Sequence, residues 1–501
     1  MERVTQQKKI SDNDLAGLTT HQPSRSGSDA TRCDTADRPS PIMDDELAGL
    51  FAPRVVPQLI IIAVSGGGDS MALMHLFARA RQLTGFSAPC SNSQVIIATV
   101  DHGLRDESLK EAQFVARAAD RLGFEHVILP WLGEKPASGL QNAAREARYK
   151  LLHDLSIERN IEPVAIMVAH HRDDQAETVL MRLGRGTGID GLKGMRKEDA
   201  SLYGDQTTIW RPLLDVPKTR LLATLTRDRV SWIEDPSNEN ADYERVRVRQ
   251  ARREREKLGL SDAALSRTAR RLLRAHAALN AMAQKSFEDH VVLKDGVYCQ
   301  LPKDFVLNAP EEIVLRVVTK AIQFVTSNKS VPNLSKLENL VSGLISFLRD
   351  TRADFKRTLG GCVITIDDSP LEKGHDSLDN KESEKGAPQR PSTLIVFYCE
   401  PGRAVLSEVL LEPGCCVNWG DRFKVRASQN ASTSLKIRAL DLKTLGDLRN
   451  LSEAAKLVPE LAAMTLPSFW DADRLIYVPH LDYCVEGWRE PLPQIEHLRA
   501  L

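Results

Sequence analysis

The sequence has little that would build a metal cluster or a disulfide framework. Its eight cysteines are scattered, and no two of them form a C-x-x-C pair. This spacing argues against the usual zinc and redox motifs. The adjacent Cys415 and Cys416 do not change this interpretation, because vicinal cysteines seldom form a disulfide. The pattern is typical of a reducing compartment, so we expect a cytoplasmic protein.

Long apolar runs and an excess of charge of one sign are also absent. No apolar run reaches the roughly 18 residues of a membrane span, and the N-terminus lacks the apolar core of a secretory signal. We therefore expect no membrane association. The formal net charge is −1, so any affinity for nucleic acid must come from local clusters of basic residues.

The 501 residues are enough for about three domains. Two stretches are polar and poor in apolar residues, and we expect them to be disordered: an N-terminal extension at 1–42 and an insertion at 367–391. Met43 is an alternative start of translation. The expected domains lie at 43–235, at 236–350, where we expect mainly helices, and at 351–501, where we expect an α+β domain.

A strand, a glycine loop and a helix follow one another near residue 65. Leu59–Val64 is apolar, Ser65-Gly66-Gly67-Gly68-Asp69-Ser70 follows, and Met71–Leu83 has helical spacing. The loop amides and the positive end of the helix form an anion site. Asp69 fits such a site if a Mg²⁺ ion joins it to phosphates. The Walker pattern G-x-x-x-x-G-K-[ST] is missing. A tight turn without a ligand is an equal alternative for the loop alone.

Further strands alternate with helices, which predicts an α/β fold with a doubly wound, mostly parallel sheet. The expected strands are Gln94–Val100, His126–Pro130 and Val164–Ala169, and the expected helices are Glu107–Leu122 and Gly139–His153. Polar residues at the carboxyl ends of such strands face one crevice. These are Asp101 to Arg105 (DHGLR) and His170 to Thr178 (HHRDDQAET).

The HHRDDQAET cluster is too polar to be explained by a single helix cap. It offers no third or fourth ligand at zinc spacing, whereas its carboxylates suit Mg²⁺. On the preceding helix, Asn142, Arg145, Arg148 and Tyr149 share one side; a solvated helix face is the alternative. We expect Arg182–Met195 (RLGRGTGIDGLKGM) to be a flexible basic loop that closes over a phosphate.

In this order, SGGGDS, DHGLR, N-x-x-R-x-x-R-Y, HHRDDQAET, RLGRGTGIDGLKGM, IWRPLL and SWIEDPSNENADYERVRVR resemble the tRNA(Ile)-lysidine synthases of the PP-loop (N-type ATP pyrophosphatase) superfamily. The resemblance is strong over residues 58–250 and weaker toward the C-terminus. SGGGDS is common to the superfamily, while HHRDDQAET together with RGTG is specific. One departure is Val246, where the family has asparagine in R-N-R-I-R, so the contact made by that asparagine is in doubt.

The resemblance implies a ligase that uses ATP and Mg²⁺. ATP adenylates the C2 oxygen of the wobble cytidine in the CAU anticodon of tRNA(Ile), and the amine of free L-lysine then displaces AMP. The product, lysidine, switches codon specificity from AUG to AUA. The sequence leaves open whether the protein forms a homodimer.

The resemblance and the residue chemistry together give a role to each candidate. The ATP-binding candidates are Ser65, Gly66, Gly67, Gly68, Asp69, Ser70 and Asp101. Asp69 and Asp173 are expected to handle Mg²⁺ and, with Arg145 and His170, to serve catalysis. Arg145 would stabilise developing charge, and His170 or a carboxylate would accept the proton of the lysine amine. The substrate-binding candidates are Asn142, Arg148, Asp174, Glu177, Arg185, Arg245, Arg247 and Arg249.

Basic residues gather beyond the catalytic domain. Tyr243–Lys257 carries seven basic and three acidic residues, and Leu265–Arg274 has four arginines without an acid. We interpret both as a phosphate-contacting face for RNA, with a solvated helix as the alternative. Farther along we expect helices at Glu311–Phe324, Leu334–Leu348 and Asn450–Met464, and strands at Cys362–Ile366, Thr393–Tyr398, Val417–Arg426 and Leu435–Ala439.

Three rival functions stay open. A tRNA 2-thiocytidine synthetase-like thiolase would activate the same cytidine oxygen, but it needs cysteines for sulfur transfer, usually as C-x-x-C. A PP-loop amidotransferase or small-molecule ligase would leave the basic middle region unexplained. An RNA-binding protein with a decayed site would not keep SGGGDS and HHRDDQAET intact.

Overall fold

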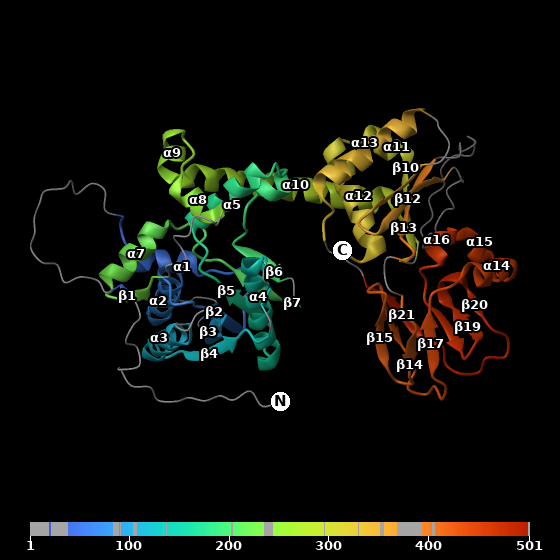
Figure 1. Cartoon of the computed structure of the whole chain (residues 1–501), viewed down its shortest axis with the longest axis horizontal. Coiled ribbons are helices and arrows are strands. Elements are labelled where there is room, and N and C mark those ends of the chain that lie inside the picture. Colours follow the sequence, from blue (N-terminus) through green and yellow to red (C-terminus); the bar gives the residue numbers. More distant parts are fainter. Residues whose placement is uncertain are drawn as a thin grey trace, which may run out of the picture. The chain divides into compact units, whose positions relative to one another are not determined.

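The computed structural model divides the chain into two compact units, Met1–Arg274 and Ala275–Leu501 (Figure 1). Helix α10 (Asp262–His290) begins in the first unit and ends in the second. The structure describes residues 20–21, 39–83, 90, 92–103, 108–133, 135–136, 138–201, 204–234, 244–294, 296–328, 330–350, 355–367, 393–402 and 406–498. Among these residues, no helix is both long and apolar enough to cross a membrane.

The first unit contains a six-stranded sheet in the order β4-β3-β2-β5-β7-β6. Its members are β2 (Leu59–Ala63), β3 (Gln94–Asp101), β4 (Glu125–Pro130), β5 (Val164–Met167), β6 (Glu198–Ser201) and β7 (Gly204–Trp210). All neighbours are parallel except β6, which is antiparallel to β7. The predicted doubly wound, mostly parallel sheet is confirmed.

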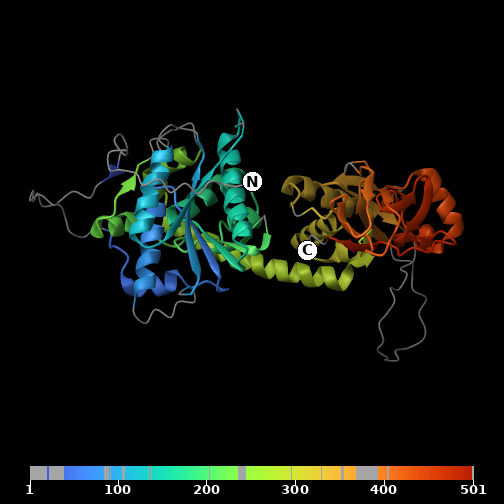
Figure 2. The same ribbon diagram turned by 90° about the horizontal axis from the view of Figure 1, so that it is seen from below.

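Helices cover both faces of this sheet. In Figure 2, α2 (Gly68–Gln82) and α3 (Ser108–Arg121), in blue, lie on one face and α4 (Leu140–Arg159), in teal, lies on the other. Along β2, Ile60 and Ile62 join the core that contains α2, whereas Leu59 and Ile61 join the core that contains α4. A fully apolar strand is therefore needed, because both of its faces are buried.

The predicted helices and strands of this unit are confirmed, with shifted ends. The largest shift is in α4, which continues six residues past the predicted end at His153. It ends only where Asn160 takes a left-handed conformation with φ of 49°. Helix α7 (Lys218–Arg227) packs on α2, and α5 (Arg172–Gly184) follows β5.

Part of the expected N-terminal extension is ordered. Thr20–His21 forms β1 and pairs with β8 (Trp232–Ile233), and the ring of His21 stacks on Trp232 at 4.4 Å. Ile42 is fully buried beside α1 (Asp44–Leu50). The expectation of disorder is wrong for these residues, because partners about 180 to 210 positions away in sequence hold them; 1–19 and 22–38 lie outside the described residues.

The segment after β8 packs against α5. Helices α8 (Glu244–Gln250) and α9 (Arg252–Lys257) precede α10. Ala176 and Val179 of α5 share a small core with Leu265 and Ala269 of α10. The basic segment is thereby joined to the helix that carries HHRDDQAET.

In the second unit, three helices pack on a sheet with the order β11-β12-β13-β10-β9. The helices are α11 (Lys303–Asn308), α12 (Glu311–Thr326) and α13 (Leu334–Asp350), and the strands are β9 (Val292–Lys294), β10 (Tyr298–Pro302), β11 (Lys356–Leu359), β12 (Cys362–Asp367) and β13 (Leu394–Cys399). The predictions for α12, α13, β12 and β13 are confirmed. The expected insertion lies outside the described residues except for Asp367, which ends β12.

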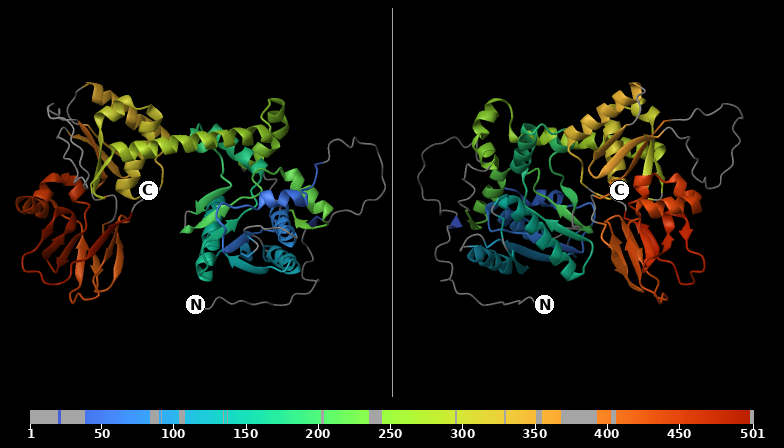
Figure 3. Two further views of the ribbon diagram at one scale, coloured as in Figure 1. Left: turned by 180° about the vertical axis from the view of Figure 1, so that it is seen from behind. Right: turned by 45° about the vertical axis from the view of Figure 1, so that its right-hand side comes forward.

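The C-terminal part of this unit, orange to red in Figure 3, contains two more antiparallel sheets, β14-β17-β18-β19-β20 and β15-β16-β21. Their strands are β14 (Val409–Leu411), β15 (Cys416–Trp419), β16 (Phe423–Arg426), β17 (Leu435–Arg438), β18 (Ser468–Asp471), β19 (Arg474–Val478), β20 (Tyr483–Cys484) and β21 (Gln494–His497). The predicted strand at 435–439 is confirmed as β17.

Two predictions in this part are wrong. The single strand expected at 417–426 is a hairpin of β15 and β16, because Gly420 and Asp421 take positive φ and reverse the chain. The single helix expected at 450–464 is the end of α14 (Leu442–Leu451) followed by the short α15 (Glu453–Leu457) and α16 (Glu460–Ala463). Ser452 caps α15, and Pro459 starts α16. The domain boundaries at 235 and 350 stay predictions.

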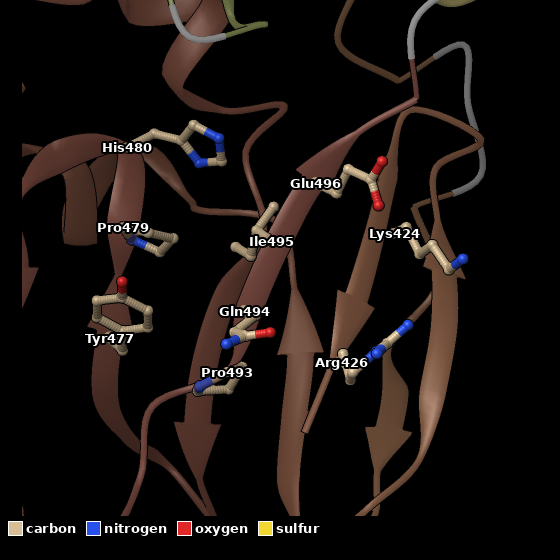
Figure 4. A pocket seen from close by; sticks show the side chains of 9 residues that line it. All are labelled: Lys424, Arg426, Tyr477, Pro479, His480, Pro493, Gln494, Ile495 and Glu496. Atoms are coloured by element: carbon tan, nitrogen blue, oxygen red, sulfur yellow. The ribbon is translucent and has the colours of Figure 1, made fainter. Parts of the chain in front are cut away.

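A groove of about 680 Å³ lies over the sheet of β16 and β21. Its lining residues are Lys424, Arg426, Tyr477, Pro479, His480, Pro493, Gln494, Ile495 and Glu496. Figure 4 shows the charged ends of Lys424 and Arg426 on one side of β21 and the rings of Tyr477 and His480 on the other. The groove thus presents two basic side chains apart from its aromatic wall.

Candidate active site

The glycine loop lies between β2 and α2, and at two of its positions neighbouring side chains leave no space for a Cβ atom. Gly66 has φ of 91°, and a Cβ there would lie 2.8 Å from Cδ1 of Ile233. A Cβ on Gly68 would meet Cδ2 of Leu222 at the same distance. At Gly67 a Cβ would have only Ser65 Oγ near it, at 3.8 Å. The loop is therefore pressed against β8 and α7 but open at Gly67.

Ser70 braces the loop from inside. Its hydroxyl accepts a hydrogen bond from the Ser65 amide at 3.1 Å and donates one to the Gly67 carbonyl at 2.9 Å. Ser70 is buried and Ser65 is exposed. Of the two loop serines, Ser65 is the one whose hydroxyl is presented to solvent.

Asp69, on the first turn of α2, is held by two cationic partners. Its Oδ2 lies 3.2 Å from Lys218 Nζ and 3.4 Å from His171 Nε2. Burial alone would raise the pKa of Asp69, but His171 and Lys218 outweigh it and lower that pKa to about 2. Oδ1 is buried and has no hydrogen-bond partner among the described residues. Asp69 is therefore ionised and has one oxygen to spare.

Asp173 is buried at the start of α5 and both of its oxygens are engaged. Oδ1 accepts a hydrogen bond from the Lys218 amide at 3.4 Å, and Oδ2 accepts one from Arg252 Nη1 at 2.8 Å. Arg252 also reaches Asp262 Oδ2 at 2.8 Å. Lys218 thus joins the two predicted metal-handling carboxylates, one through its side chain and the other through its backbone.

His171 begins α5 as its N-cap and completes this first cluster. The residue is 1% exposed, its Nδ1 lies 3.4 Å from the Asp174 amide nitrogen, and its Nε2 faces Asp69 and Asp174. Burial would lower the pKa of His171, but the carboxylates of Asp69, Asp174 and Asp173 raise it above its usual value.

Two further carboxylates of α5 are paired with arginines of α8. Glu177 is 2% exposed and forms ion pairs with Arg245 and Arg249, while Asp174 Oδ1 lies 3.4 Å from Arg249 Nη2. Burial raises the pKa of Glu177 despite Arg249. For Asp174 burial acts in the same direction, but the neighbouring histidines and Arg245 lower its pKa. These predicted substrate-binding residues therefore form one cluster.

A second group of candidates lies at the ends of β3 and α4. Asp101 accepts a hydrogen bond from the Gly103 amide at 2.8 Å, which closes the turn after β3. Arg148 Nη2 lies 3.4 Å from His102 Nε2, and Arg145 lies over the ring of Tyr149 at 5.2 Å. Asn142, Arg145 and Arg148 are exposed, so this face is open to a ligand.

His170 connects the two groups electrostatically. Burial is the largest of the effects that lower the pKa of His170 to about 3. The charges of three arginines, Arg211, Arg145 and Arg245, act in the same direction, while the charge of Asp174 acts in the opposite direction. Its Nδ1 is buried and has no hydrogen-bond partner among the described residues. The ring is uncharged near pH 7 and can accept a hydrogen bond.

The basic loop of residues 182–195 is tied down rather than free. It contains the short helix α6 (Ile189–Leu192), and Gln175 exchanges two hydrogen bonds with the backbone of Met195 at 2.8 and 2.7 Å. Arg182 donates to the Gly191 carbonyl at 2.8 Å. The expectation of a flexible loop is wrong for its second half, because Gln175 and Arg182 of α5 hold residues 191–195. Arg185, at the end of α5, pairs with Glu244 and stays 60% exposed.

Sequence reasoning missed several residues of the site. Lys218 follows IWRPLL but belongs to no motif, and only the folded chain brings it to Asp69. Arg252 lay within the basic segment assigned to RNA, although it pairs with Asp173. Arg247 is exposed on α8, while Val246, the departure from the family pattern, is 6% exposed.

The residues present fit Mg²⁺ only in part. Among the described residues, no group of three or more His, Cys, Asp or Glu side chains could hold a metal. Mg²⁺ commonly uses one or two carboxylates plus substrate phosphates. The unpartnered Oδ1 of Asp69 fits this role, whereas Asp173 would first have to give up a hydrogen bond.

Comparison with known proteins places this site in a family. A model of the PP-loop domain matches residues 39–254, and it supports the use of ATP. A tRNA(Ile)-lysidine synthase of Methylobacterium nodulans is 40% identical over 319 residues, which cover 62% of this chain and 88% of that protein. One from Ruegeria pomeroyi is 32% identical and covers 87% of this chain and 91% of its own length.

The solved structure of the U34-tRNA thiolase NcsA from Methanococcus maripaludis, with its [4Fe-4S] cluster, aligns with a TM-score of 0.38 and 20% identity. The alignment covers 46% of this chain and 77% of that chain, and it is too weak to bear on function. The family model and the long, 32–40% identical relatives together show that this chain belongs to the tRNA(Ile)-lysidine synthase family.

Proposed function

We propose that this chain joins free L-lysine to C2 of the wobble cytidine in the CAU anticodon of tRNA(Ile), and that ATP is cleaved to AMP and pyrophosphate. Membership in the family supports the reaction. The observation that supports the site most directly is the pairing of Asp69 and Asp173 through Lys218 beside the glycine loop.

The loop binds ATP in this proposal. The amides around Gly67 approach the phosphates, because that part of the loop has space for them. Ser65 adds an exposed hydroxyl, Ser70 holds the loop in shape, and Asp101 orients the nucleotide through the turn that it closes. Mg²⁺ at Asp69, with Asp173 as a second ligand, would supply positive charge against the phosphates.

Arg145 stabilises the charge that develops on the cytidine oxygen or on phosphate. It is exposed beside Tyr149, and its charge reaches His170. Asn142 and Arg148 line the same face and hold the nucleotide being modified. Positive groups that are already in position stabilise the negative charge of the transition state without having to rearrange.

The lysine substrate binds at the cluster of α5 and α8. Asp174 and Glu177 supply negative charge for its ammonium groups, and Arg245 and Arg249 supply the fork that a carboxylate prefers. His170 offers its free ring nitrogen to the attacking amine. With a pKa of about 3, the ring is a better acceptor of a hydrogen bond than of a full proton.

The tRNA extends from this site along exposed basic residues. Arg185, Arg247 and several arginines of α10 have exposed side chains in the first unit. Lys424 and Arg426 supply basic side chains in the second unit. We assign RNA contacts to both predicted C-terminal domains and a cytoplasmic location to the enzyme. Sedimentation of the purified protein tests the open question of a homodimer, which would have twice the mass of one chain.

Labelled lysine tests the function directly. The purified protein is incubated with ATP, Mg²⁺ and tRNA(Ile) bearing CAU, and we expect lysine in the tRNA in proportion to released pyrophosphate. Methionine tRNA with the same anticodon is the control and should stay unlabelled. Background levels of both products would overturn the proposal. Sulfur incorporation from a sulfide donor without any lysine would favour the thiolase instead.

A further inference from the structure

Lys218 stands at the junction of the two acidic positions of the site. It is the first residue of α7, directly after the N-cap Pro217. Its ammonium group lies 3.2 Å from Asp69 Oδ2, and its amide donates to Asp173 Oδ1 at 3.4 Å. The backbone of Lys218 is thereby fixed by one carboxylate, while its side chain is directed to the other.

The helix that carries Lys218 is packed against the glycine loop. Leu222, one turn later on α7, lies 2.8 Å from where a Cβ on Gly68 would be, and helices α2 and α7 are packed together. The Lys218 side chain is 40% exposed, so four rotatable bonds let its ammonium group move toward the solvent side of the loop. The backbone of Lys218 is therefore fixed, while its side chain has space to change conformation.

The charges at Asp69 favour such a movement. Without nucleotide, Lys218 and His171 neutralise Asp69, and one of its oxygens has no partner among the described residues. Bound ATP brings several negative charges next to the loop, and a divalent cation competes for the carboxylate. Lysine binds phosphate as a mobile point charge. When the ammonium group of Lys218 moves from Asp69 to phosphate, the phosphates gain a positive partner and the Asp69 carboxylate is left for the divalent cation.

We propose that Lys218 is a phosphate-binding residue of the ATP site, held by Asp69 until ATP binds and then contacting the phosphates that leave as pyrophosphate. This inference rests on the proposed use of ATP. No covalent bond to Lys218 forms or breaks in this role. Its charge opposes the negative charge that the departing pyrophosphate gathers.

The test compares two lysines of similar geometry. Lys197 pairs with Asp215 at 3.2 Å and is 49% exposed, so Lys197→Met removes a matched ion pair from the same unit. We expect Lys218→Met to weaken ATP binding, measured by equilibrium dialysis with Mg²⁺, by about tenfold or more, the equivalent of one charged hydrogen bond. Lys197→Met should bind ATP as the unaltered protein does.

A purely structural role for Lys218 gives different results. Lys218→Arg keeps the charge and should restore most of the ATP affinity, and tRNA affinity should be unchanged in all three variants. Equal ATP affinity for Lys218→Met and the unaltered protein would overturn the proposal, as would a loss in Lys218→Arg as large as in Lys218→Met. Failure of the unaltered protein to bind ATP would instead reject the proposed function.

Discussion

Nε2 of His171 lies 3.4 Å from Oδ2 of Asp69, although the two residues come from different helices and the histidine is 1% exposed. The pKa of the histidine is raised and that of the aspartate is lowered to about 2. The pair is thus strongest when both groups are charged.

This pair predicts a pH dependence of stability. Because folding raises the pKa of His171 above 6.5, its contribution is fully present below pH 6.5 and is lost as the pH rises through the folded-state value. His171→Asn keeps a side chain that can cap α5 but has no charge. The unfolding free energies of the two proteins, measured in urea between pH 5.5 and 9, should converge at the alkaline end. A difference that stays constant over this range would show that charge has no part in it.

Asp69→Asn should abolish ATP cleavage while leaving the fold intact. The amide keeps the size of the side chain but loses the charge that faces Lys218 and His171. We expect pyrophosphate release to fall by about 10²-fold or more, as for other groups that act on charge in the transition state. Near-normal release in the variant would remove Asp69 from the mechanism.

Gly66→Ala and Gly67→Ala should separate stability from binding. Alanine at Gly66 is strained by its φ of 91° and meets Ile233 at 2.8 Å, so we expect a loss of about 1–3 kcal/mol of stability. Alanine at Gly67 meets nothing closer than 3.8 Å, so the melting temperature should hold while ATP affinity falls. Unchanged ATP affinity in Gly67→Ala would place the phosphates elsewhere.

Arg252→Met should destabilise the site more than Arg253→Met. Arg252 bridges the buried Asp173 and Asp262, whereas Arg253 is an exposed neighbour. Because Arg252 is itself 40% exposed and Arg255 also pairs with Asp262, we expect a loss of about 1–2 kcal/mol rather than the full cost of a broken buried pair. Chemical denaturation of both variants measures it. Equal stabilities would mean that the bridge is not formed in solution.

The exposed arginines of α10 should govern the salt dependence of tRNA binding. Arg271→Ala with Arg274→Ala removes two exposed charges. The slope of log affinity against log salt should flatten by roughly 0.7–0.9 per lost phosphate contact. Filter binding between 50 and 300 mM salt measures the slope, and an unchanged slope would contradict a role for this face.

The sequence predicted what depends on local pattern. Apolar runs and helical spacing were enough for the parallel sheet, and carboxyl-end placement was enough to gather Asp69 and HHRDDQAET into one region. The partners of those residues could not be predicted in the same way. Lys218 and Arg252 reach Asp69 and Asp173 across 149 and 79 positions, and nothing in their local sequence marks them. The hairpin at Gly420 was missed because its two strands together have the composition of one.

The carboxylates in the first turns of α5 determine where the chain can be truncated without losing part of the site. Asp173, Asp174 and Glu177 are paired with arginines of α8 and α9 that lie 68 to 79 positions downstream. A fragment that stops at the predicted boundary of 235 would remove the arginines that pair with these three buried carboxylates. Extending it through Asp262 restores Arg245, Arg249, Arg252 and the acid that orients Arg252. The smallest fragment with a complete site therefore extends beyond the residues of the sheet. Truncations made for expression or crystallisation should lie after α9.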